Sequence, residues 1–209
     1  MPTTPGAQEW IPSEPSVKSL ESAAQSCRGC ELWQDANQVV FSRGESTARL
    51  MLVGEQPGDH EDREGQPFVG PAGQLLAKAL DAAGVDQEDL YLTNAVKHFR
   101  HEQRGKRRIH RKPELRHLVA CHPWLEAEIA VVVPAMIICC GATAGRAVLG
   151  RPVQIGKERG VALDELPGRA ALITTHPSAL LRMRRDPDYD DAFDAFVSDL
   201  QVATRHVGL

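Results

Sequence analysis

Long hydrophobic runs are absent from this sequence of 209 residues. Because a helix needs about 20 consecutive apolar residues to cross a bilayer, no membrane-spanning segment is expected. The N-terminal stretch, residues 1–15, also lacks the basic start and apolar core of a signal peptide, and it is rich in Pro, Ser and Thr. We therefore expect residues 1–15 to be a disordered tail and the protein to be cytoplasmic. Residues 16–209 are long enough for a single domain with a full hydrophobic core.

An overall excess of basic charge is also absent, since the formal net charge is −4. Taken alone, this charge argues against nucleic acid as a partner. The distribution is uneven, however: residues 100–116 hold eight Lys or Arg and two Glu, a local charge of +6 that leaves −10 on the remaining residues. Basic charge concentrated in one segment of an acidic protein indicates a phosphate-binding surface. The alternative is an ordinary solvated loop.

A glycine-rich loop, residues 54–73, joins the apolar run at residues 50–53 to an amphipathic helix expected over residues 74–83. Glycine-rich loops between a strand and a helix usually bind phosphates through bare backbone N–H groups. This loop lacks the lysine of a nucleotide-binding P-loop and carries carboxylates instead, so a nucleoside triphosphate is a poor candidate. Carboxylates together with one phenylalanine, Phe68, suit a flat and uncharged ring better.

Four apolar runs alternate with helical patterns, at residues 50–53, 90–96, 135–140 and 170–175. This alternation predicts the α/β class, with three α/β/α layers and a mostly parallel central sheet of about four strands. Residues 153–166 could add an edge ribbon. Functional groups of such sheets gather at the carboxyl ends of the strands. Here those ends carry Glu55, Gln56, Asp59, Asn94 and His176.

Five cysteines are present, and in a cytosolic protein disulfides are not expected. Cys27 and Cys30 form a CxxC pair, which suits a metal, an iron–sulfur cluster or redox chemistry. A redox pair normally opens a helix, whereas this one ends a helical stretch, so a ligand role is favoured; two further ligands are then needed. Cys121 lies on the apolar stripe of a helix and suits either a ligand or a core residue. Cys139 and Cys140 are expected to be core residues, one on each face of their strand.

Several motifs, taken in order along the chain, resemble those of the type 4 uracil-DNA glycosylases, within the uracil-DNA glycosylase superfamily. The likeness covers roughly residues 27–202, and the motifs are residues 54–58 with 67–73, residues 93–97, residues 141–144, and His176-Pro177-Ser178. The resemblance implies a uracil-DNA glycosylase-like fold and the excision of uracil from DNA.

Two departures from the type 4 pattern are informative. His98 stands where type 4 enzymes usually have a cysteine that ligates an iron–sulfur cluster. The segment after it is longer and contains Lys106-Arg107-Arg108-Ile109-His110, which resembles the UdgX subgroup. Members of that subgroup become covalently attached to uracil-containing DNA through the histidine of this segment. Gln56 is also typical of the subgroup.

The resemblance implies a role for each candidate. Phe68 would stack on uracil, and Asn94 would pair with the uracil edge, because an amide offers both a donor and an acceptor. His176 would stabilise charge on the leaving base near its O2 atom. Glu55 would stabilise an oxocarbenium-like sugar, with Asp59 as a nearby orienting group. Core packing for Phe68, strand capping for Asn94 and loop fixing for His176 are the structural alternatives.

For the remaining residues, His110 would be the nucleophile, with Glu55 fixing its tautomer. Without the resemblance, a histidine in a basic loop would more often be a surface residue. Arg108 resembles the residue that holds the loop near the site, although it could equally be one phosphate contact among several. The substrate-binding set is completed by Gln56, Gly54 and Ser178.

Cys27, Cys30 and Cys121 match family ligand positions, and with His98 they imply a 4Fe-4S cluster. Three cysteines and one histidine are equally good ligands for zinc, the weaker alternative. The leading prediction is a monomeric protein, without membrane association, that flips and excises uracil from DNA, preferring single strands, and then joins itself to the abasic sugar through His110. The alternatives are a multiple-turnover type 4 glycosylase and a non-catalytic binder of single-stranded nucleic acid with a structural metal.

Overall fold

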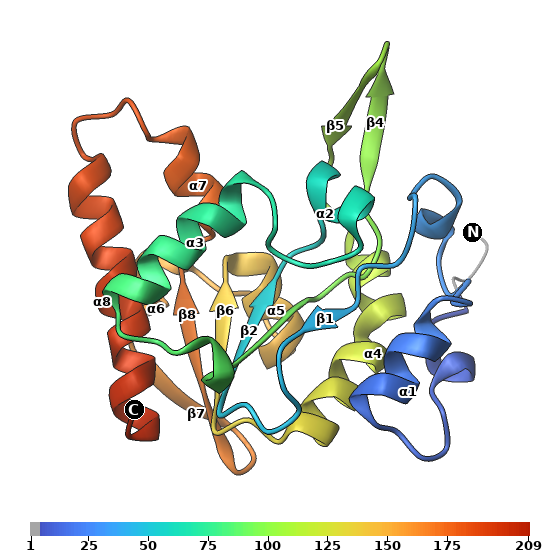
Figure 1. Cartoon of the computed structure of the whole chain (residues 1–209), viewed down its shortest axis with the longest axis horizontal. Helices are drawn as coiled ribbons and strands as arrows, with labels where there is room; N and C mark the ends of the chain where they lie inside the picture. The colour runs from blue at the N-terminus through green and yellow to red at the C-terminus, as the bar shows by residue number, and fades with distance from the viewer. Residues whose placement is uncertain (1–4) are drawn as a thin grey trace.

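The computed structural model describes residues 5–209, and its centre is a six-stranded sheet with helices on both faces (Figure 1). The strand order is β1-β3-β2-β6-β8-β7. The strands are β1 (Ser42–Arg43), β2 (Leu50–Gly54), β3 (Leu90–Asn94), β6 (Met136–Cys140), β7 (Ala162–Leu166) and β8 (Arg169–Thr174). The predicted α/β/α fold is confirmed. The four predicted strands form the parallel centre. The antiparallel edge strand β7 lies within the edge ribbon that residues 153–166 could add, whereas the antiparallel edge strand β1 was not expected.

The central strands are apolar on both faces because helices cover both faces. Every residue of β2, β3 and β6 is buried. Alternate residues point to opposite layers: Cys140 packs in the core beneath α3 and α8, and Cys139 packs in the core beneath α4 and α5. The prediction of one buried thiol on each face is therefore confirmed.

The helices divide between these two faces (Figure 1). One face carries α3 (Pro71–Ala82) and α8 (Tyr189–Val207), whereas the other carries α4 (Leu115–Val132) and α5 (Ala142–Leu149). The remaining helices are α1 (Val17–Ala24), α2 (Asp59–Glu64), α6 (Ile155–Glu158) and α7 (Pro177–Arg182), with 3-10 turns at Gln8–Trp10, Glu31–Gln34 and Gln87–Asp89. No helix in residues 5–209 is long and apolar enough to cross a membrane.

The parallel register brings the carboxyl ends of the strands together. Gly54 at the end of β2 pairs with Asn94 at the end of β3, and Cys140 at the end of β6 pairs with Thr174 at the end of β8. The chain continues this pairing beyond β3, since the N–H of Ala95 donates to the carbonyl of Gly54 at 2.9 Å. The segments that follow all four strands therefore leave the sheet at one edge.

The basic segment is a β-hairpin and not the loop that we expected. It consists of β4 (His101–Arg104) and β5 (Arg107–His110), and it projects from the edge of the molecule beside α2 (Figure 1). Gly105 opens the two-residue turn with a φ of 58°, a left-handed conformation that glycine adopts easily. The register pairs His101 with His110 at the base of the hairpin.

The expected disordered tail also needs correction for residues 5–15. The N–H of Gly6 donates to the carbonyl of Gly29 at 3.0 Å, and the N–H of Ala7 donates to the carbonyl of Ala120 at 2.8 Å. Ala7 is buried, and a 3-10 turn follows at Gln8–Trp10. This segment is therefore packed against the CxxC loop and α4. Residues 1–4 lie outside the described part of the chain.

Candidate active site

A cavity of about 650 Å³ opens at the edge of the sheet where the parallel strands end. The four central strands each contribute to its wall at or just after their last residue, through Glu55, Asn94, Gly141 and His176. The predicted site residues that line the cavity are Glu55, Gln56, Phe68, Asn94, His110, His176 and Ser178. Its volume is that of a pocket for a small ligand. Gly54 lies beneath it, whereas Asp59 and Arg108 are outside its lining.

Phe68 and Asn94 meet above the end of β2, at Gly54. A Cβ atom on Gly54 would lie 2.3 Å from Asn94 Oδ1 and 2.8 Å from Phe68 Cζ, so only glycine fits there. Phe68 has a φ of 57°, which is uncommon for a residue with a side chain. The loop packs closely at this point, since a Cβ on Gly73 would lie 1.8 Å from the Phe68 carbonyl oxygen. The aromatic ring and the amide are thus held side by side.

Phe68 also lines a second cavity, of about 580 Å³. Its other walls are mainly aliphatic side chains of α3 and β3, with Arg43, Asp81 and Asp86. None of the other predicted site residues reaches it. The cavity with the two histidines and the amide is therefore the candidate site.

Glu61 holds the glycine-rich loop closed, a role that the sequence analysis missed. Its Oε2 accepts the N–H of Gly58 at 3.1 Å and its Oε1 accepts the N–H of Gly70 at 2.8 Å. Those two glycines precede the first residues of α2 and α3, so one buried carboxylate satisfies both helix N-termini. The spacing of Glu61 three residues after Gly58 is that of a capping box, and it could have revealed the contact.

Glu55 and His110 face each other across the cavity. The distance from His110 Nε2 to Glu55 Oε1 is 3.6 Å. The other carboxylate oxygen of Glu55 accepts a hydrogen bond from the hydroxyl of Thr143, on the first turn of α5. Burial lowers the pKa of His110 below its ordinary value, although the carboxylate of Glu55 opposes this shift. The imidazole is therefore neutral at pH 7, the form in which a ring nitrogen has a free lone pair.

The tautomer of His176 is set by Ser178. The N–H of Ser178 donates to His176 Nδ1 at 3.1 Å, and the Ser178 hydroxyl lies 2.8 Å from the same atom. Burial lowers the pKa of His176 to about 4, with smaller contributions from His110 and Arg182. Because Nδ1 of this neutral ring accepts a hydrogen bond, its proton resides on Nε2, which is left as a donor. Ser178 thus acts on the histidine, beyond lining the cavity.

Gln56 lines the cavity, but its amide binds the base of the hairpin. Its Nε2 donates to the carbonyls of Arg100, at 3.1 Å, and Arg111, at 3.2 Å. Its Oε1 accepts the N–H of Arg100 at 3.2 Å. These two residues flank β4 and β5, so Gln56 joins both strands to the end of β2. The expected substrate contact of Gln56 competes with three hydrogen bonds to the hairpin backbone.

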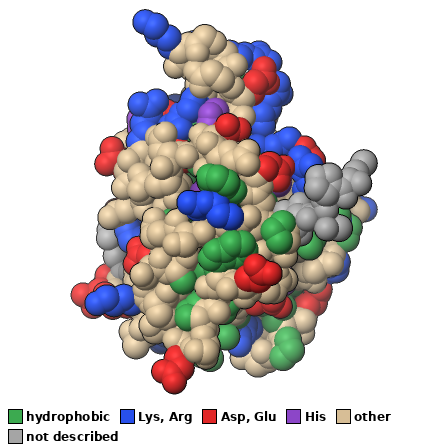
Figure 2. Space-filling view, turned by 90° about the vertical axis from the view of Figure 1, so that its right-hand side faces the viewer, with side chains coloured by type: hydrophobic (Ala, Val, Ile, Leu, Met, Phe, Trp, Pro, Cys, Tyr) green, Lys and Arg blue, Asp and Glu red, His purple; other side chains and the backbone are tan. Residues whose placement is uncertain are grey.

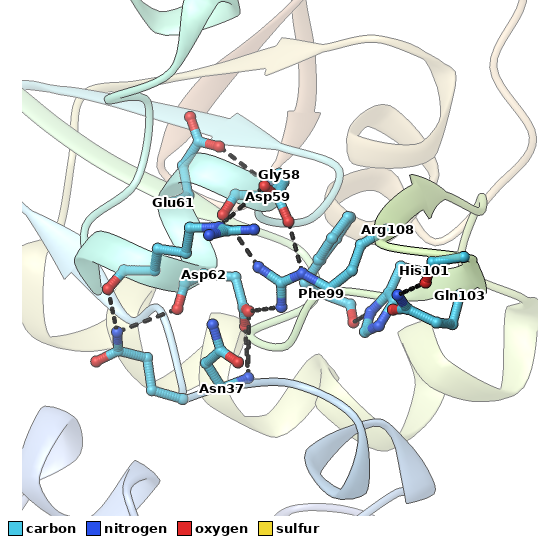
Figure 3. A network of polar contacts seen from close by, with 12 residues as sticks. Asn37, Gly58, Asp59, Glu61, Asp62, Phe99, His101, Gln103 and Arg108 are labelled. Carbon is cyan, nitrogen blue, oxygen red and sulfur yellow. Dashed lines mark hydrogen bonds and ion pairs between the residues drawn. The ribbon is translucent and has the colours of Figure 1, made fainter.

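Arg108 and Asp59 are paired with each other outside the cavity (Figure 3). Arg108 Nε lies 2.6 Å from Asp59 Oδ1, and Nη1 lies 2.5 Å from Oδ2 of the buried Asp62. The guanidinium also lies over the Phe99 ring, 5.5 Å from its centre. Burial alone would raise the pKa of Asp59, but its ion pairs with Arg63 and Arg108 outweigh burial and lower it. Arg108 therefore anchors the hairpin to α2, and Asp59 is its acceptor.

The comparisons with known proteins agree with this geometry. The model of the uracil DNA glycosylase superfamily matches residues 41–201. This chain belongs to that superfamily. It is 37% identical over 172 residues to a type-4 uracil-DNA glycosylase of Thermotoga maritima, covering 82% of this chain and 86% of the relative. A type-4 uracil-DNA glycosylase of Pyrobaculum aerophilum is 34% identical over 176 residues, which cover 79% of this chain and 85% of the relative. A type-5 uracil-DNA glycosylase of the same organism is 31% identical over 150 residues, which cover 65% of this chain and 63% of the relative.

The predicted metal ligands of this superfamily member surround one small, separate cavity. Its lining includes Cys27, Cys30, His98 and Cys121. Two N–H groups donate to the sulfur atoms: Trp124 Nε1 lies 3.4 Å from Cys27 Sγ, and the N–H of Lys97 lies 3.3 Å from Cys121 Sγ. Such bonds stabilise thiolates, the form of cysteine that binds metals.

Burial changes the pKa of these side chains, which decides the form in which each could bind a metal. It raises the pKa of Cys30 to about 11 and of Cys121 to about 12, so a thiolate there needs a cation. Burial lowers the pKa of His98 to about 4, which keeps the imidazole neutral and able to ligate. Within residues 5–209, no three His, Cys, Asp or Glu side chains are arranged to hold a metal ion. By chemistry the donor set of three cysteines and one histidine around one cavity fits an iron–sulfur cluster and also a zinc ion.

Ion pairs neutralise part of the positive charge of the hairpin region, residues 100–116. Five of its arginines contact carboxylates: Arg100, Arg104, Arg108, Arg111 and Arg116. Among the described residues, no ion pair is found for Lys106 and Arg107 near the hairpin tip or for Lys112, which lines the cavity together with Arg182. Figure 2 shows Lys and Arg side chains around the projecting end of the molecule. These cations are the ones free to contact phosphates.

Proposed function

We propose that this protein excises uracil from DNA and then becomes covalently joined to the abasic sugar through His110. The supporting observation is that His110 lines the same cavity as Glu55, Phe68 and Asn94, with its Nε2 atom 3.6 Å from the Glu55 carboxylate. The superfamily membership and the names of the type-4 relatives support the uracil-DNA glycosylase activity. The UdgX-like segment and the proximity of His110 to Glu55 support the covalent step.

Recognition of the base would rest on Phe68 and Asn94. The aromatic ring offers a flat surface for a planar base, and the neighbouring amide can donate to uracil O4 and accept from N3–H. Cytosine presents an amine and an unprotonated N3 at these positions, so an amide held in the same orientation would be mismatched at both. Gly54 allows both side chains to approach the base from one side.

Cleavage of the glycosidic bond would use Glu55 and His176. The bonding electrons leave with uracil, so positive charge develops on the sugar and negative charge on the base. The carboxylate of Glu55, oriented by Thr143, would stabilise the sugar cation. The Nε2–H of His176 would donate to uracil O2 and stabilise the leaving anion.

Capture, the formation of a covalent bond between His110 and the sugar, would follow at C1′, the carbon that uracil has left. A ring nitrogen of neutral His110 gives its lone pair to C1′, an N–C bond forms, and the ring then loses its remaining N–H proton to Glu55 or to water. The neutral imidazole left on the sugar is a poor leaving group, so one protein molecule reacts once. DNA is best supplied as a single strand, because flipping a base costs least there. The free cations, Lys106, Arg107, Lys112 and Arg182, are the proposed phosphate contacts.

We also infer that Cys27, Cys30, His98 and Cys121 hold a 4Fe-4S cluster, with zinc as the weaker alternative. Its role is structural, since these residues come from the CxxC loop, the segment after β3, and α4. Metal analysis of the purified protein, together with visible absorption, tests the inference. Iron with the broad absorption of an iron–sulfur cluster supports it, whereas zinc without such absorption contradicts it.

A conventional multiple-turnover glycosylase is the second candidate, favoured by the type-4 names of the most similar relatives described above. The number of uracil molecules released per protein molecule separates the two functions. Excess uracil-containing single-stranded DNA is incubated with the protein, and free uracil is measured. A plateau at about one uracil per protein supports capture, continued release supports turnover, and no release contradicts both.

A further inference from the structure

Two opposite charges are buried between the candidate active site and the cysteine-lined cavity. The side chain of Lys97, in the segment after β3, is 1% exposed, and that of Glu128, on α4, is 0% exposed. They form an ion pair. A buried pair of this kind seldom adds stability over apolar residues of similar size, because both charges lose their hydration. The pair is therefore expected to hold neighbouring residues in position.

The Lys97 ammonium contacts the last residues of β3. Its Nζ donates to Thr93 Oγ1 at 2.6 Å, to the carbonyl of Asn94 at 3.0 Å and to Glu128. All three of its protons are thus used. The Thr93 and Tyr91 hydroxyls lie 2.8 Å and 3.0 Å from Glu128 Oε1. The pair therefore holds the strand end that carries the Asn94 amide.

The backbone of Lys97 faces the other way. Its N–H donates to Cys121 Sγ at 3.3 Å, and His98, the next residue, lines the cysteine cavity. Cys121 and Glu128 lie two turns apart on α4, so the same helix contacts both the backbone and the ammonium of Lys97. The segment from Asn94 to His98 is consequently fixed to α4 at two points.

We propose that Lys97 and Glu128 are positioning residues for the Asn94 amide, and that they set the selectivity of the cavity for uracil. This inference rests on the proposed function. The hydrogen bond from Lys97 to the Asn94 carbonyl fixes the backbone from which the amide projects. Without it, the amide would shift relative to the base edge, and displacements of about 1 Å can lower rates roughly a hundredfold.

The test uses the double variant Lys97→Met/Glu128→Leu, which removes both charges and leaves neither one buried alone. The backbone N–H to Cys121 is retained, so the metal content should match that of the wild type. The single-turnover rate of uracil release from single-stranded DNA should fall tenfold or more, and the preference for uracil over cytosine should narrow. Arg151→Met/Glu165→Leu removes an exposed ion pair outside the linings of both cavities and serves as the control for the loss of two opposite charges.

A double-mutant cycle separates positioning from general damage. In an Asn94→Ala background the double replacement should cause no further loss, because it acts through that amide. An additional loss of the same size would overturn the proposal. Thr93→Val, which removes one Lys97 acceptor and nearly preserves shape, should give a smaller loss if the double variant does not fold. An unchanged rate in Thr93→Val would then count against it.

The side-chain amide signal of Asn94 in a nitrogen–proton NMR spectrum supplies a readout independent of activity. The signal is identified by its absence in Asn94→Ala, and it should move in the Lys97/Glu128 double variant. A moved signal with no uracil release by the wild type would contradict only the proposed function. An unmoved signal would overturn the positioning role itself.

Discussion

At the scale of the residue, the two histidines of the cavity differ in what controls their protons. His176 accepts the N–H of Ser178 on Nδ1, which leaves Nε2–H as a donor toward the cavity. Among residues 5–209, the side-chain polar contact found for the His110 ring is the approach of its Nε2 to Glu55 Oε1 at 3.6 Å. One ring is thus fixed as a hydrogen-bond donor, while the other keeps a nitrogen lone pair for bond formation.

The lowered pKa of His110 predicts the pH dependence of capture. An ordinary histidine with a pKa of 6.5 is half protonated at that pH, but burial lowers the pKa of His110 below this value. Since the protonated ring has no lone pair, adduct formation should still exceed half of its plateau rate at pH 6.5 and should reach half only at lower pH. Single-turnover adduct rates across pH 4 to 8 test this. A rate that is already halved at pH 6.5 would contradict it.

At the scale of the element, the β4–β5 hairpin is held to the rest of the molecule by side chains. Gln56 binds the backbone at its base, and Arg108 pairs with Asp59 and Asp62 of α2. The hairpin carries His110 on its last position, so its orientation decides whether the imidazole reaches the cavity. Capture therefore depends on contacts that lie outside the cavity.

Replacing Arg108 by Met should separate excision from capture. The hairpin would lose its ion pairs to α2, and the buried Asp62 would lose a partner, which should lower stability by about 3 kcal/mol. The adduct rate of the folded variant should fall roughly tenfold or more, while uracil release falls less. Arg104→Met removes an exposed pair on the same hairpin and should change neither rate, since such pairs contribute little. Equal losses of release and capture in Arg108→Met would argue against this role of the hairpin.

Sequence patterns were sufficient for the four parallel strands, because each is an apolar run between helical patterns. They were insufficient for β1, which has two residues, and for the hairpin, whose strands are polar, whereas β7 lies within the edge ribbon that residues 153–166 were expected to add. Seven of the residues that line the cavity follow strand ends or known motifs and were predicted as site residues: Glu55, Gln56, Phe68, Asn94, His110, His176 and Ser178. Glu61, Thr143 and the Lys97–Glu128 pair were missed, because their roles depend on contacts between distant segments.

At the scale of the whole molecule, an acidic chain carries one strongly basic segment, residues 100–116, whose cations are partly paired with carboxylates. Of the basic residues in the segment 100–116, those without an ion pair among residues 5–209 are Lys106, Arg107 and Lys112. The rest are largely neutralised by carboxylates. Phosphate binding should therefore depend on fewer side chains than the local charge of the segment indicates.

The salt dependence of DNA binding tests whether the cations without an ion pair are the ones that contact phosphates. Each phosphate contact to a single strand contributes about 0.7 to the slope of log affinity against log salt concentration. Lys112→Ala should lower the slope by about that amount, whereas Arg116→Ala, which removes a cation paired with Glu31, should leave it nearly unchanged. Fluorescence anisotropy with labelled single-stranded DNA over a series of salt concentrations measures both. The opposite order of the two variants would contradict the assignment.

The covalent role of His110 is tested most directly by a denaturing gel of the boiled reaction with end-labelled, uracil-containing single-stranded DNA. His101 is the matched control, because it pairs with His110 across the hairpin and lies outside the cavity lining. We predict a slow, heat-stable protein–DNA band with the wild type and with His101→Ala, and none with His110→Ala. A band that persists in His110→Ala, or a wild type that gives only abasic DNA in excess of protein, would contradict the account.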